Sequence, residues 1–246
     1  MRKVFARTQN VKNFINLMNN LQSRAEGVPG MALVYGEPGL GKTKTVLWWA
    51  AQNNAVFIRS TNLMSGRWLL EELVEELGEI PFFRSVDLFK QCTRILQEEP
   101  RVIIVDEIDY LATDARAIET LRDIHDKTGT PILLVGMGMA NKKLMRYRHL
   151  YDRISEILKF VPFTLEDVKA IIEQLSEIEM TECAIRFIYN RSNRFRQIVR
   201  LISKAENIAE ANGLSVIDEI TLMELLNDDE RENIEADKGA KQVLSR

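Results

Sequence analysis

VYGEPGLGKTKTVLWW (residues 34–49) opens with apolar residues typical of a strand, continues through a loop with three glycines and ends in an apolar helix. Glycines let successive backbone amides turn inward, so a loop of this kind cradles phosphate at the start of a helix. The Lys42 side chain would reach the β- and γ-phosphates of a nucleotide, and the Thr43 hydroxyl would ligate Mg²⁺. The alternative is a glycine-rich turn with a solvated lysine, which the strand before the loop and the helix after it disfavour. The predicted nucleotide contacts are Gly36, Glu37, Pro38, Gly39, Leu40, Gly41, Lys42, Thr43 and Lys44.

RVIIVDEIDYL (101–111) supplies the other half of the predicted site. Its apolar run ends in Asp106 and Glu107, which places both carboxylates at the carboxyl edge of a buried strand, where open α/β sheets bind ligands. Asp106 would lie just outside the coordination shell of the Mg²⁺ that Thr43 ligates, and Glu107 would polarise an attacking water as general base. Paired acids after a strand can also be helix N-caps, but the phosphate loop upstream favours the catalytic interpretation. Water is then the predicted phosphoryl acceptor.

Short apolar segments alternate with helical patterns in the first part of the chain. This alternation indicates a parallel sheet with helices on both faces, and burial on both faces explains the continuous Val, Ile and Leu runs. We therefore expect an α/β fold, a P-loop NTPase sheet sandwiched by helices. The expected strands are 31–35, 55–59, 101–106 and 131–136, and the expected helices are 43–53, 67–78, 85–98 and 115–127.

Only helical patterns follow FVPF (160–163), which predicts a second, all-helical domain. TLED (164–167) has the form of a capping box, with Thr164 placed to accept the amide N–H of residue 167, and NGL (212–214) predicts the end of the long helix before it. The expected helices are 164–176, 181–191, 194–212 and 218–226. The expected domains are a nucleotide-binding domain over 1–162, a helical lid over 163–227 and an acidic tail, polar enough to fray, over 228–246.

The composition of the 246 residues, 46% apolar and 28% charged, is that of an ordinary soluble protein. No apolar run approaches the roughly 18 residues that cross a bilayer, and the start of the chain lacks the apolar stretch of a signal peptide. We therefore expect a cytoplasmic protein without a membrane partner. Cys92 and Cys183 each lie in an apolar-periodic segment and are expected to be small buried side chains.

The net charge of −3 hides two basic segments. Residues 141–159 carry six Lys and Arg against two acids, and residues 186–204 carry six against none. Residues 228–238 have the opposite balance, with six acids against two bases. The charge of each segment matters more than the net charge of the chain, so these two basic segments could still contact phosphate groups.

Arg153, in YDRISEI, and Arg196, in SNRFRQIVRL, are candidates for contact with a γ-phosphate, because a guanidinium binds oxyanions through two parallel hydrogen bonds. If Arg153 projects from a neighbouring subunit, hydrolysis requires assembly. If Arg196 reaches across from the helical domain, the nucleotide controls the angle between domains. Each could instead be a surface arginine that packs its stem on a helix. His125 and His149 lack the spacing of a metal site and are assigned no role.

These motifs, in this order and followed by a helical lid, resemble the AAA+ ATPases. The resemblance extends from about Thr8 to Ser215 and is closer to one branch, the target-selection ATPases of transposons of the phage Mu B and TniB type. It implies ATP and Mg²⁺ as cofactors, ATP hydrolysis, head-to-tail helical oligomers or filaments on double-stranded DNA when ATP is bound, and delivery of that DNA to a DDE transposase. The segments that carry the resemblance are VYGEPGLGKTKT, IIVDEIDYL, IETLRDIHDKTGTPILLVGM, YDRIS and SNRFRQIVRLISKAENIAEANG.

By position in the family's motifs, the resemblance implies that Arg153 is the arginine finger and Arg196 the second sensor. The chain departs from the family pattern at two places. MGMAN (137–141) has no Asn, Ser or Thr directly after the fourth strand, where a first sensor is common, which leaves Asn141 as a late substitute. Asn193 stands where glycine often precedes the second sensor. The chain also begins almost at the ATPase core, so a separate helix-turn-helix reader is not expected.

DNA contacts are expected from Lys and Arg side chains repeated in each subunit, which give affinity without sequence preference and a steep dependence on salt. The segment IRSTNLMSGRWLL (58–70), after the second strand, is the first candidate. The alternatives are that Arg67 only opens the next helix and that Lys142 and Lys143 form a solvated face. The candidates are Arg59, Asn62, Ser65 and Arg67, with Lys142 and Lys143 as the second choice.

A second function is compatible with the same motifs. It is a nucleotide-gated adaptor or helicase-loader-type ATPase whose main partner is protein, recruited through the acidic residues 228–238. A small-molecule kinase is disfavoured by Glu107 and by the helical lid.

Overall fold

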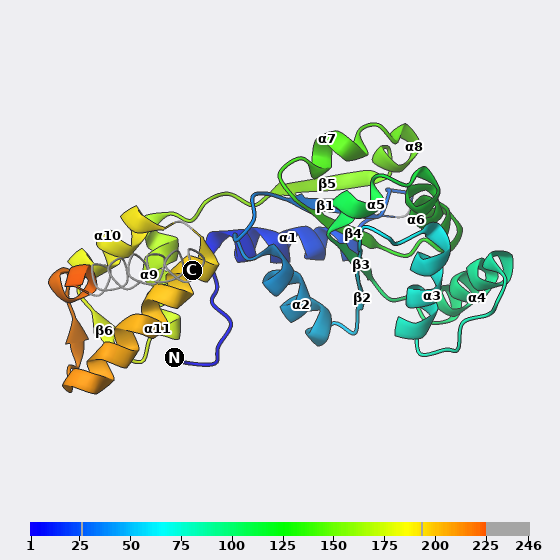
Figure 1. Cartoon of the computed structure of the whole chain (residues 1–246). Helices are drawn as coiled ribbons and strands as arrows, with labels where there is room; N and C mark the ends of the chain where they lie inside the picture. The colour runs from blue at the N-terminus through cyan, green and yellow to red at the C-terminus, as the bar shows by residue number, and fades with distance from the viewer. Residues whose placement is uncertain (26, 193, 225–246) are drawn as a thin grey trace, which may run out of the picture. The chain divides into compact units, whose positions relative to one another are not determined.

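The computed structural model describes residues 1–25, 27–192 and 194–224. They form two compact units, which we call the sheet unit (Gln9–Val161) and the helical unit (Met1–Thr8 with the described residues from Pro162 onward) (Figure 1). Each unit has a hydrophobic core of its own. Asn193 and the predicted tail 228–246 lie outside the described residues.

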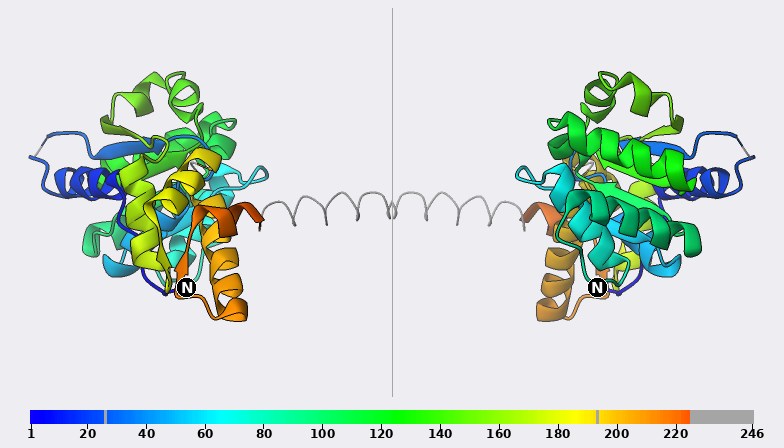
Figure 2. Two further views of the ribbon diagram at one scale, coloured as in Figure 1. Left: turned by 90° about the vertical axis from the view of Figure 1, so that its left-hand side faces the viewer. Right: turned by 90° about the vertical axis from the view of Figure 1, so that its right-hand side faces the viewer.

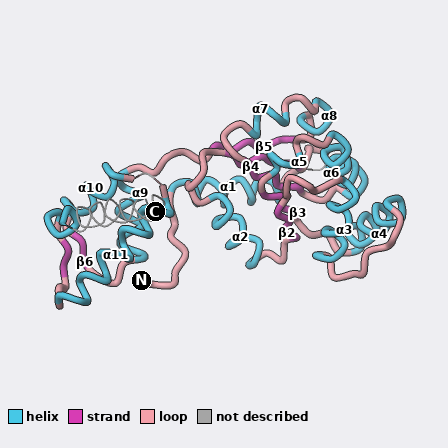
Figure 3. Tube along the Cα trace, in the orientation of Figure 1, coloured by secondary structure: helices cyan, strands magenta, loops and turns pink. Residues whose placement is uncertain are grey.

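Five parallel strands form the central sheet of the sheet unit, in the order β2-β3-β4-β1-β5 (Figure 3). Met31 at the start of β1 pairs with Ile132 on one side and with Ile154 on the other. Since β1 is flanked on both sides, the loop that follows it leaves the sheet between neighbouring strands at the carboxyl edge. The strands are β1 (Met31–Tyr35), β2 (Val56–Arg59), β3 (Ile103–Asp106), β4 (Ile132–Gly136) and β5 (Ile154–Lys159).

Helices cover both faces of this sheet. Successive strand residues point to opposite faces: Met31 and Leu33 share a core with residues of α3, α4 and α6, whereas Ala32 and Val34 share one with α1 and α2. In the right-hand view of Figure 2, α3, α4 and α6 face the viewer. This arrangement confirms the predicted α/β sandwich. The helices are α1 (Gln9–Gln22), α2 (Lys42–Gln52), α3 (Gly66–Glu76), α4 (Ser85–Glu98), α5 (Ile108–Leu111), α6 (Ala115–Thr128), α7 (Ala140–Leu144) and α8 (Arg148–Tyr151).

The four predicted strands form within two residues of their expected bounds, but the expected elements do not include β5 or α1. Residues of β5 alternate between half-buried and exposed, and β5 is one of the two edge strands of the sheet. Its exposed positions are Ser155, Ile157 and Lys159, and Glu156 is half-buried between them, so polar residues interrupt the apolar run of ISEILK. An edge strand lacks the continuous apolar run that marks the central strands.

The helical unit contains α9 (Leu165–Leu175), α10 (Glu182–Arg191) and α11 (Phe195–Asn212), close to three predicted helices, and residues 219–224 are also helical. The predicted helical unit is thus confirmed, with one small addition. Two short parallel strands, β6 (Glu179–Met180) and β7 (Val216–Ile217), pair beside the helices. Two-residue strands are too short to produce a periodic signal in the sequence.

Two local predictions for this unit are confirmed. Thr164 Oγ1 accepts a hydrogen bond from the Asp167 amide, and the Asp167 side chain accepts one from the Thr164 amide, which completes the capping box. Gly213 ends α11 in the left-handed conformation, with φ of 65°.

The first eight residues group with the helical unit, whereas the predicted boundary placed them in the nucleotide-binding domain. The Arg2 amide donates to Leu175 O (2.8 Å), and the terminal ammonium of Met1 pairs with Glu177 (2.7 Å) and Glu206 (2.8 Å). Ala6 belongs to the core of the helical unit. Sequence position alone does not reveal such a return of the chain.

The two cysteines differ from each other. Cys92 is buried in the core of the sheet unit, and burial raises the pKa of its thiol to about 12. Cys183 is exposed on α10, so the prediction that it is buried is wrong. It is the second residue of α10, directly before the buried Ala184 and Ile185.

Candidate nucleotide-binding site

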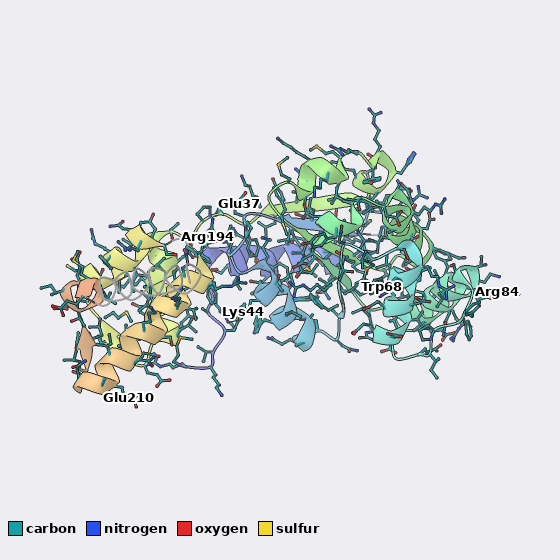
Figure 4. All side chains as sticks on the ribbon, viewed as in Figure 1. Glu37, Lys44, Trp68, Arg84, Arg194 and Glu210 are labelled. Atoms are coloured by element: carbon teal, nitrogen blue, oxygen red, sulfur yellow. The ribbon has the colours of Figure 1, made fainter. Side chains whose placement is uncertain are left out.

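The loop between β1 and α2 has the backbone that a phosphate cradle requires. A Cβ atom at Gly36 would lie 2.6 Å from the Phe160 carbonyl oxygen, so only glycine fits there. Gly41, at the N-cap of α2, has a φ of 87°, a conformation that side chains disfavour. Glu37 lies in this loop and Lys44 in the first turn of α2 (Figure 4). Backbone amides at the start of a helix point along its axis and can donate to an anion.

Lys42 lies against this loop. Its Nζ donates to the carbonyl oxygens of Gly36 (2.7 Å) and Glu37 (3.0 Å). Burial lowers the pKa of this ammonium, and the carboxylates of Asp106 and Asp109 oppose that shift. A partly desolvated cation whose partners are neutral carbonyl oxygens suits the binding of phosphate, which would supply the missing negative charge.

Thr43 and Asp106 bring the two predicted motifs together. Thr43 Oγ1 donates to Asp106 Oδ2 at 2.8 Å, and the Glu107 amide donates to Asp106 Oδ1 at 2.9 Å. Asp106 is buried, which raises the pKa of its carboxyl although both hydrogen bonds lower it. A divalent cation beside this carboxylate would stabilise its charged form.

The donor set at this edge fits Mg²⁺ that arrives with a nucleotide. Oxygen atoms are the preferred ligands of Mg²⁺, which usually takes few from the protein and the rest from phosphate and water. Within the described ranges, no group of three or more His, Cys, Asp and Glu side chains could hold a metal ion by itself. Thr43 and Asp106 would therefore hold the ion together with the phosphates.

Glu107 directly follows β3 and has a left-handed backbone, with φ of 56°. Its carbonyl oxygen accepts a hydrogen bond from Ser60 Oγ at 2.6 Å, which ties the turn to the end of β2. Its carboxylate forms an ion pair with Arg59, the last residue of β2. The structure thus places Arg59, a predicted DNA contact, against the predicted general base, although the two residues are 48 positions apart in the sequence.

The turn after β4 lies beside the phosphate loop. A Cβ atom at Gly138 would collide with the Glu37 carboxylate. Asp109, buried behind the turn, accepts the Met137 amide at 2.5 Å and pairs with Lys143 Nζ at 3.2 Å. Asn141, the predicted substitute for a first sensor, lies on α7, which follows this turn. Its Oδ1 accepts a hydrogen bond from the Tyr151 hydroxyl at 3.0 Å.

Arg153 lies at the opposite edge of the sheet from the phosphate loop. The Met31 amide, at the start of β1, donates to the Arg153 carbonyl at 3.0 Å. The phosphate loop follows the other end of β1, so about 16 Å of strand separates the two positions, at roughly 3.3 Å per residue. The Arg153 guanidinium makes two hydrogen bonds to Asp126 of α6, at 2.9 and 3.0 Å.

The remaining predicted residues lie on surfaces. Arg196 is exposed in the first turn of α11. Ser65 is the N-cap of α3, where its hydroxyl accepts the Trp68 amide, and Arg67 pairs with Glu71 at 2.8 Å. Asn62 and Lys142 are exposed, in the loop before α3 and on α7 respectively. Among the described helices, none is long and apolar enough to cross a membrane.

His125, which the sequence left without a role, supports the fold. Its Nδ1–H donates to the Thr130 carbonyl at 2.8 Å, and its Nε2 accepts the Gly30 amide at 3.1 Å, an arrangement that requires the neutral ring. Burial lowers the pKa of this imidazole. A partner 95 positions away in the sequence leaves no local signal.

Comparisons with known proteins agree with this geometry. Residues 25–144 match the family model described as "AAA domain". The replication factor C large subunit of Aeropyrum pernix is 28% identical over 188 residues, which cover 74% of this chain and 35% of that protein. The ATP-dependent target DNA activator B of Escherichia phage Mu is 28% identical over 179 residues, 69% of this chain and 55% of that protein. The chain thus spans only about a third to a half of these relatives.

A solved structure resembles this chain over most of its length. The ORC2 protein of Aeropyrum pernix, determined in ADPNP and ADP complexes, aligns with a TM-score of 0.70 at 17% identity, and covers 92% of this chain and 70% of that chain. At this identity the likeness concerns the fold. The chain therefore has the fold of the P-loop AAA+ ATPases, and its residues 25–144 match the AAA domain model.

Proposed function

We propose that this chain with an AAA domain is an ATPase that binds ATP and Mg²⁺ at the loop Gly36–Thr43, assembles head to tail on double-stranded DNA and delivers that DNA to a transposase. The observation that carries the proposal is the contact between Thr43 and Asp106, with Glu107 beside it. It joins a phosphate cradle, an ion-binding pair and a candidate base at one sheet edge. The relative from phage Mu, named as an ATP-dependent target DNA activator, motivates the choice of DNA as partner.

The chemical step assigned to this site is the attack of water on the γ-phosphate. The loop amides and Lys42 would hold and orient the phosphates. Mg²⁺ held by Thr43 and Asp106 would stabilise the negative charge that develops on the phosphates in the transition state. Glu107 would accept a proton from the attacking water. General-base help of this kind contributes roughly 10²–10⁴ in rate.

Arg153 supports a requirement for assembly. It lies about 16 Å of strand away from the loop of its own protomer, at 3.3 Å per residue, so a finger role requires a neighbouring subunit. A contact between one subunit's Arg153 edge and the next subunit's loop edge joins two different surfaces. Heterologous contacts of that kind generate rings or helical filaments. In the same proposal, Arg196 is the second sensor and Asn141 the late substitute for a first sensor.

Arg59 offers a route by which DNA could control hydrolysis. Arg59 pairs with Glu107, and its side chain is 60% exposed, so a phosphate of DNA can reach it. A phosphate that draws Arg59 away would free the Glu107 carboxylate for water. Asn62, Ser65, Arg67, Lys142 and Lys143 are the other proposed contacts of the DNA backbone.

A specific surface favours a second candidate, an adaptor or loader whose main partner is protein. The loop between α3 and α4 exposes Ile80 by 87% and Phe83 by 84%, and Phe82 and Val86 are exposed beside them. Arg84, at the start of α4, lines the same cavity of about 550 Å³ as Phe82 and Phe83 (Figure 4). Exposed apolar patches of this kind are typical of protein interfaces.

Filter binding of a random-sequence DNA duplex in the presence of ATP, ADP or a non-hydrolysable ATP analogue distinguishes the two proposed functions. We expect tight binding only in the ATP-like states, with affinity that falls steeply with salt, since the contacts are to phosphate. A failure to bind DNA in any nucleotide state at low salt would rule out the first function and favour the second. The Arg67→Ala variant is the internal check, because it should weaken DNA binding without changing ATP binding.

A further inference from the structure

The pairing of Arg153 with Asp126 imitates the pairing of an arginine with phosphate. Arg153 Nε lies 2.9 Å from Asp126 Oδ1, and a terminal nitrogen of the same guanidinium lies 3.0 Å from Oδ2. A guanidinium fork binds the oxygens of a phosphate in the same bidentate way. The hydrogen bond from Arg153 is the main reason why the pKa of Asp126 is lowered.

The backbone of Arg153 is fixed while its side chain is accessible. Its amide donates to Leu150 O at 2.9 Å, and its carbonyl accepts the Met31 amide at 3.0 Å. The side chains of Arg153 and Asp126 are 37% and 36% exposed. Both line a cavity of about 640 Å³, which Arg24 also lines. An anion can therefore reach the guanidinium without any change in the strands.

Asp126 has a second partner available if Arg153 leaves it. Arg122 Nε lies 3.9 Å from Asp126 Oδ2, and it is a buried nitrogen without a hydrogen-bond partner among the described residues. A small shift of the carboxylate would satisfy both groups. Exchange of partners would thus not leave an unpaired carboxylate, which is the usual cost of breaking an ion pair.

We propose that Asp126 is a positioning residue that occupies, in the free protomer, the place on Arg153 that a phosphate of the neighbouring subunit's nucleotide takes on assembly. This inference rests on the proposed function, in which Arg153 acts in a neighbouring active site. Asp126 competes with that phosphate and so raises the protein concentration needed for assembly. It does not touch the reacting atoms, and once the phosphate has displaced it the rate of hydrolysis is independent of it.

Sedimentation with a non-hydrolysable ATP analogue tests the proposal through assembly rather than activity. In Asp126→Asn the concentration for half-maximal assembly should fall about two- to fivefold, the range expected for an exposed ion pair. ATP turnover at saturating protein should stay at the wild-type value, and Asp126→Glu should keep the wild-type midpoint. Asp123→Asn is the matched control, because Asp123 lies on the same helix and pairs with Arg122 but not with Arg153.

The outcomes separate this inference from the proposed function. An unchanged or higher assembly midpoint in Asp126→Asn, with turnover still lost in Arg153→Ala, would overturn the role of Asp126 and keep the finger. Full turnover in Arg153→Ala would instead overturn the finger itself. If Asp126→Asn melts early, Asp126→Ser provides the same loss of charge, and the same shift in its midpoint is required.

Discussion

The two edges of the central sheet hold charged groups in opposite ways. At the carboxyl edge, Asp106 is buried and Lys42 is partly desolvated, and each is fixed by short contacts with its neighbours. At the amino edge, Arg153 and Asp126 are more than a third exposed and pair with each other. Separating a buried charge from its partner costs more free energy than separating a half-exposed one, because water can solvate the half-exposed charge. We infer that the phosphate loop with Asp106 is built to hold a ligand in a single geometry. The half-exposed pair of Arg153 and Asp126, like that of Arg59 and Glu107, is able to exchange one partner for another.

The largest expected effect comes from the amino edge. Arg153→Ala should lower ATP turnover about 1,000-fold, the lower end of the contribution of an arginine finger, and leave nucleotide affinity unchanged. Because the finger acts in the next subunit, mixing this variant with Lys42→Ala should restore part of the activity. The measurement is steady-state phosphate release from each variant and from the mixture. Activity that does not recover on mixing would assign Arg153 to its own protomer.

At the carboxyl edge, Glu107→Gln should lower turnover on the order of 100-fold or more, because the amide cannot accept the proton of the attacking water. Nucleotide binding should remain, so ATP-bound assemblies should accumulate. Single-turnover hydrolysis together with sedimentation measures both effects. Glu71→Gln, a surface carboxylate paired with Arg67, is the control. Wild-type turnover in Glu107→Gln would mean that another group is the base.

Substitution of His125 tests how much this side chain stabilises the amino edge of the sheet. His125→Ala leaves the Gly30 amide and the Thr130 carbonyl without their partner, which should cost about 1–3 kcal/mol of unfolding free energy. His149→Ala, at an exposed position, should change it by less than about 0.5 kcal/mol. Denaturant unfolding at pH 7.5 compares the two variants, and equal losses would contradict the structural role of His125.

Because of the same histidine, we expect the stability of the folded protein to depend on pH. The pKa of His125 in the folded protein is lowered from its ordinary value of 6.5 by burial. The unfolded chain therefore binds the proton more readily, so the stability is complete above pH 6.5 and falls as the pH drops through that value. Thermal unfolding between pH 7.5 and 5.5 should show a smaller loss in His125→Ala than in the unmodified protein.

The sequence predicts the carboxyl edge better than the amino edge for a physical reason. A phosphate cradle and a base need particular residue types at fixed spacing, so Gly36–Thr43 and the Asp106–Glu107 pair carry their signal within a few positions. The partners Arg59 and Glu107, Arg153 and Asp126, and His125 and Gly30 meet only in the folded chain, because they lie 48, 27 and 95 positions apart in the sequence. The other four strands are predicted from their continuous apolar runs, and β5 is missed because its exposed residues alternate with half-buried ones.

The smallest expected effect links the carboxyl edge to DNA. Arg59→Ala removes the ion pair with Glu107, so turnover in the absence of DNA should rise about two- to fivefold, the range of a partly exposed pair, and its stimulation by DNA should shrink. Arg67→Ala is the matched control. It should weaken DNA binding in the same way but leave DNA-free turnover unchanged, because Arg67 pairs with Glu71 and not with Glu107. Phosphate release with and without a DNA duplex measures both variants. If Arg59→Ala lowered DNA-free turnover, the arginine would position the base rather than withhold it, and the carboxyl edge would be complete without DNA.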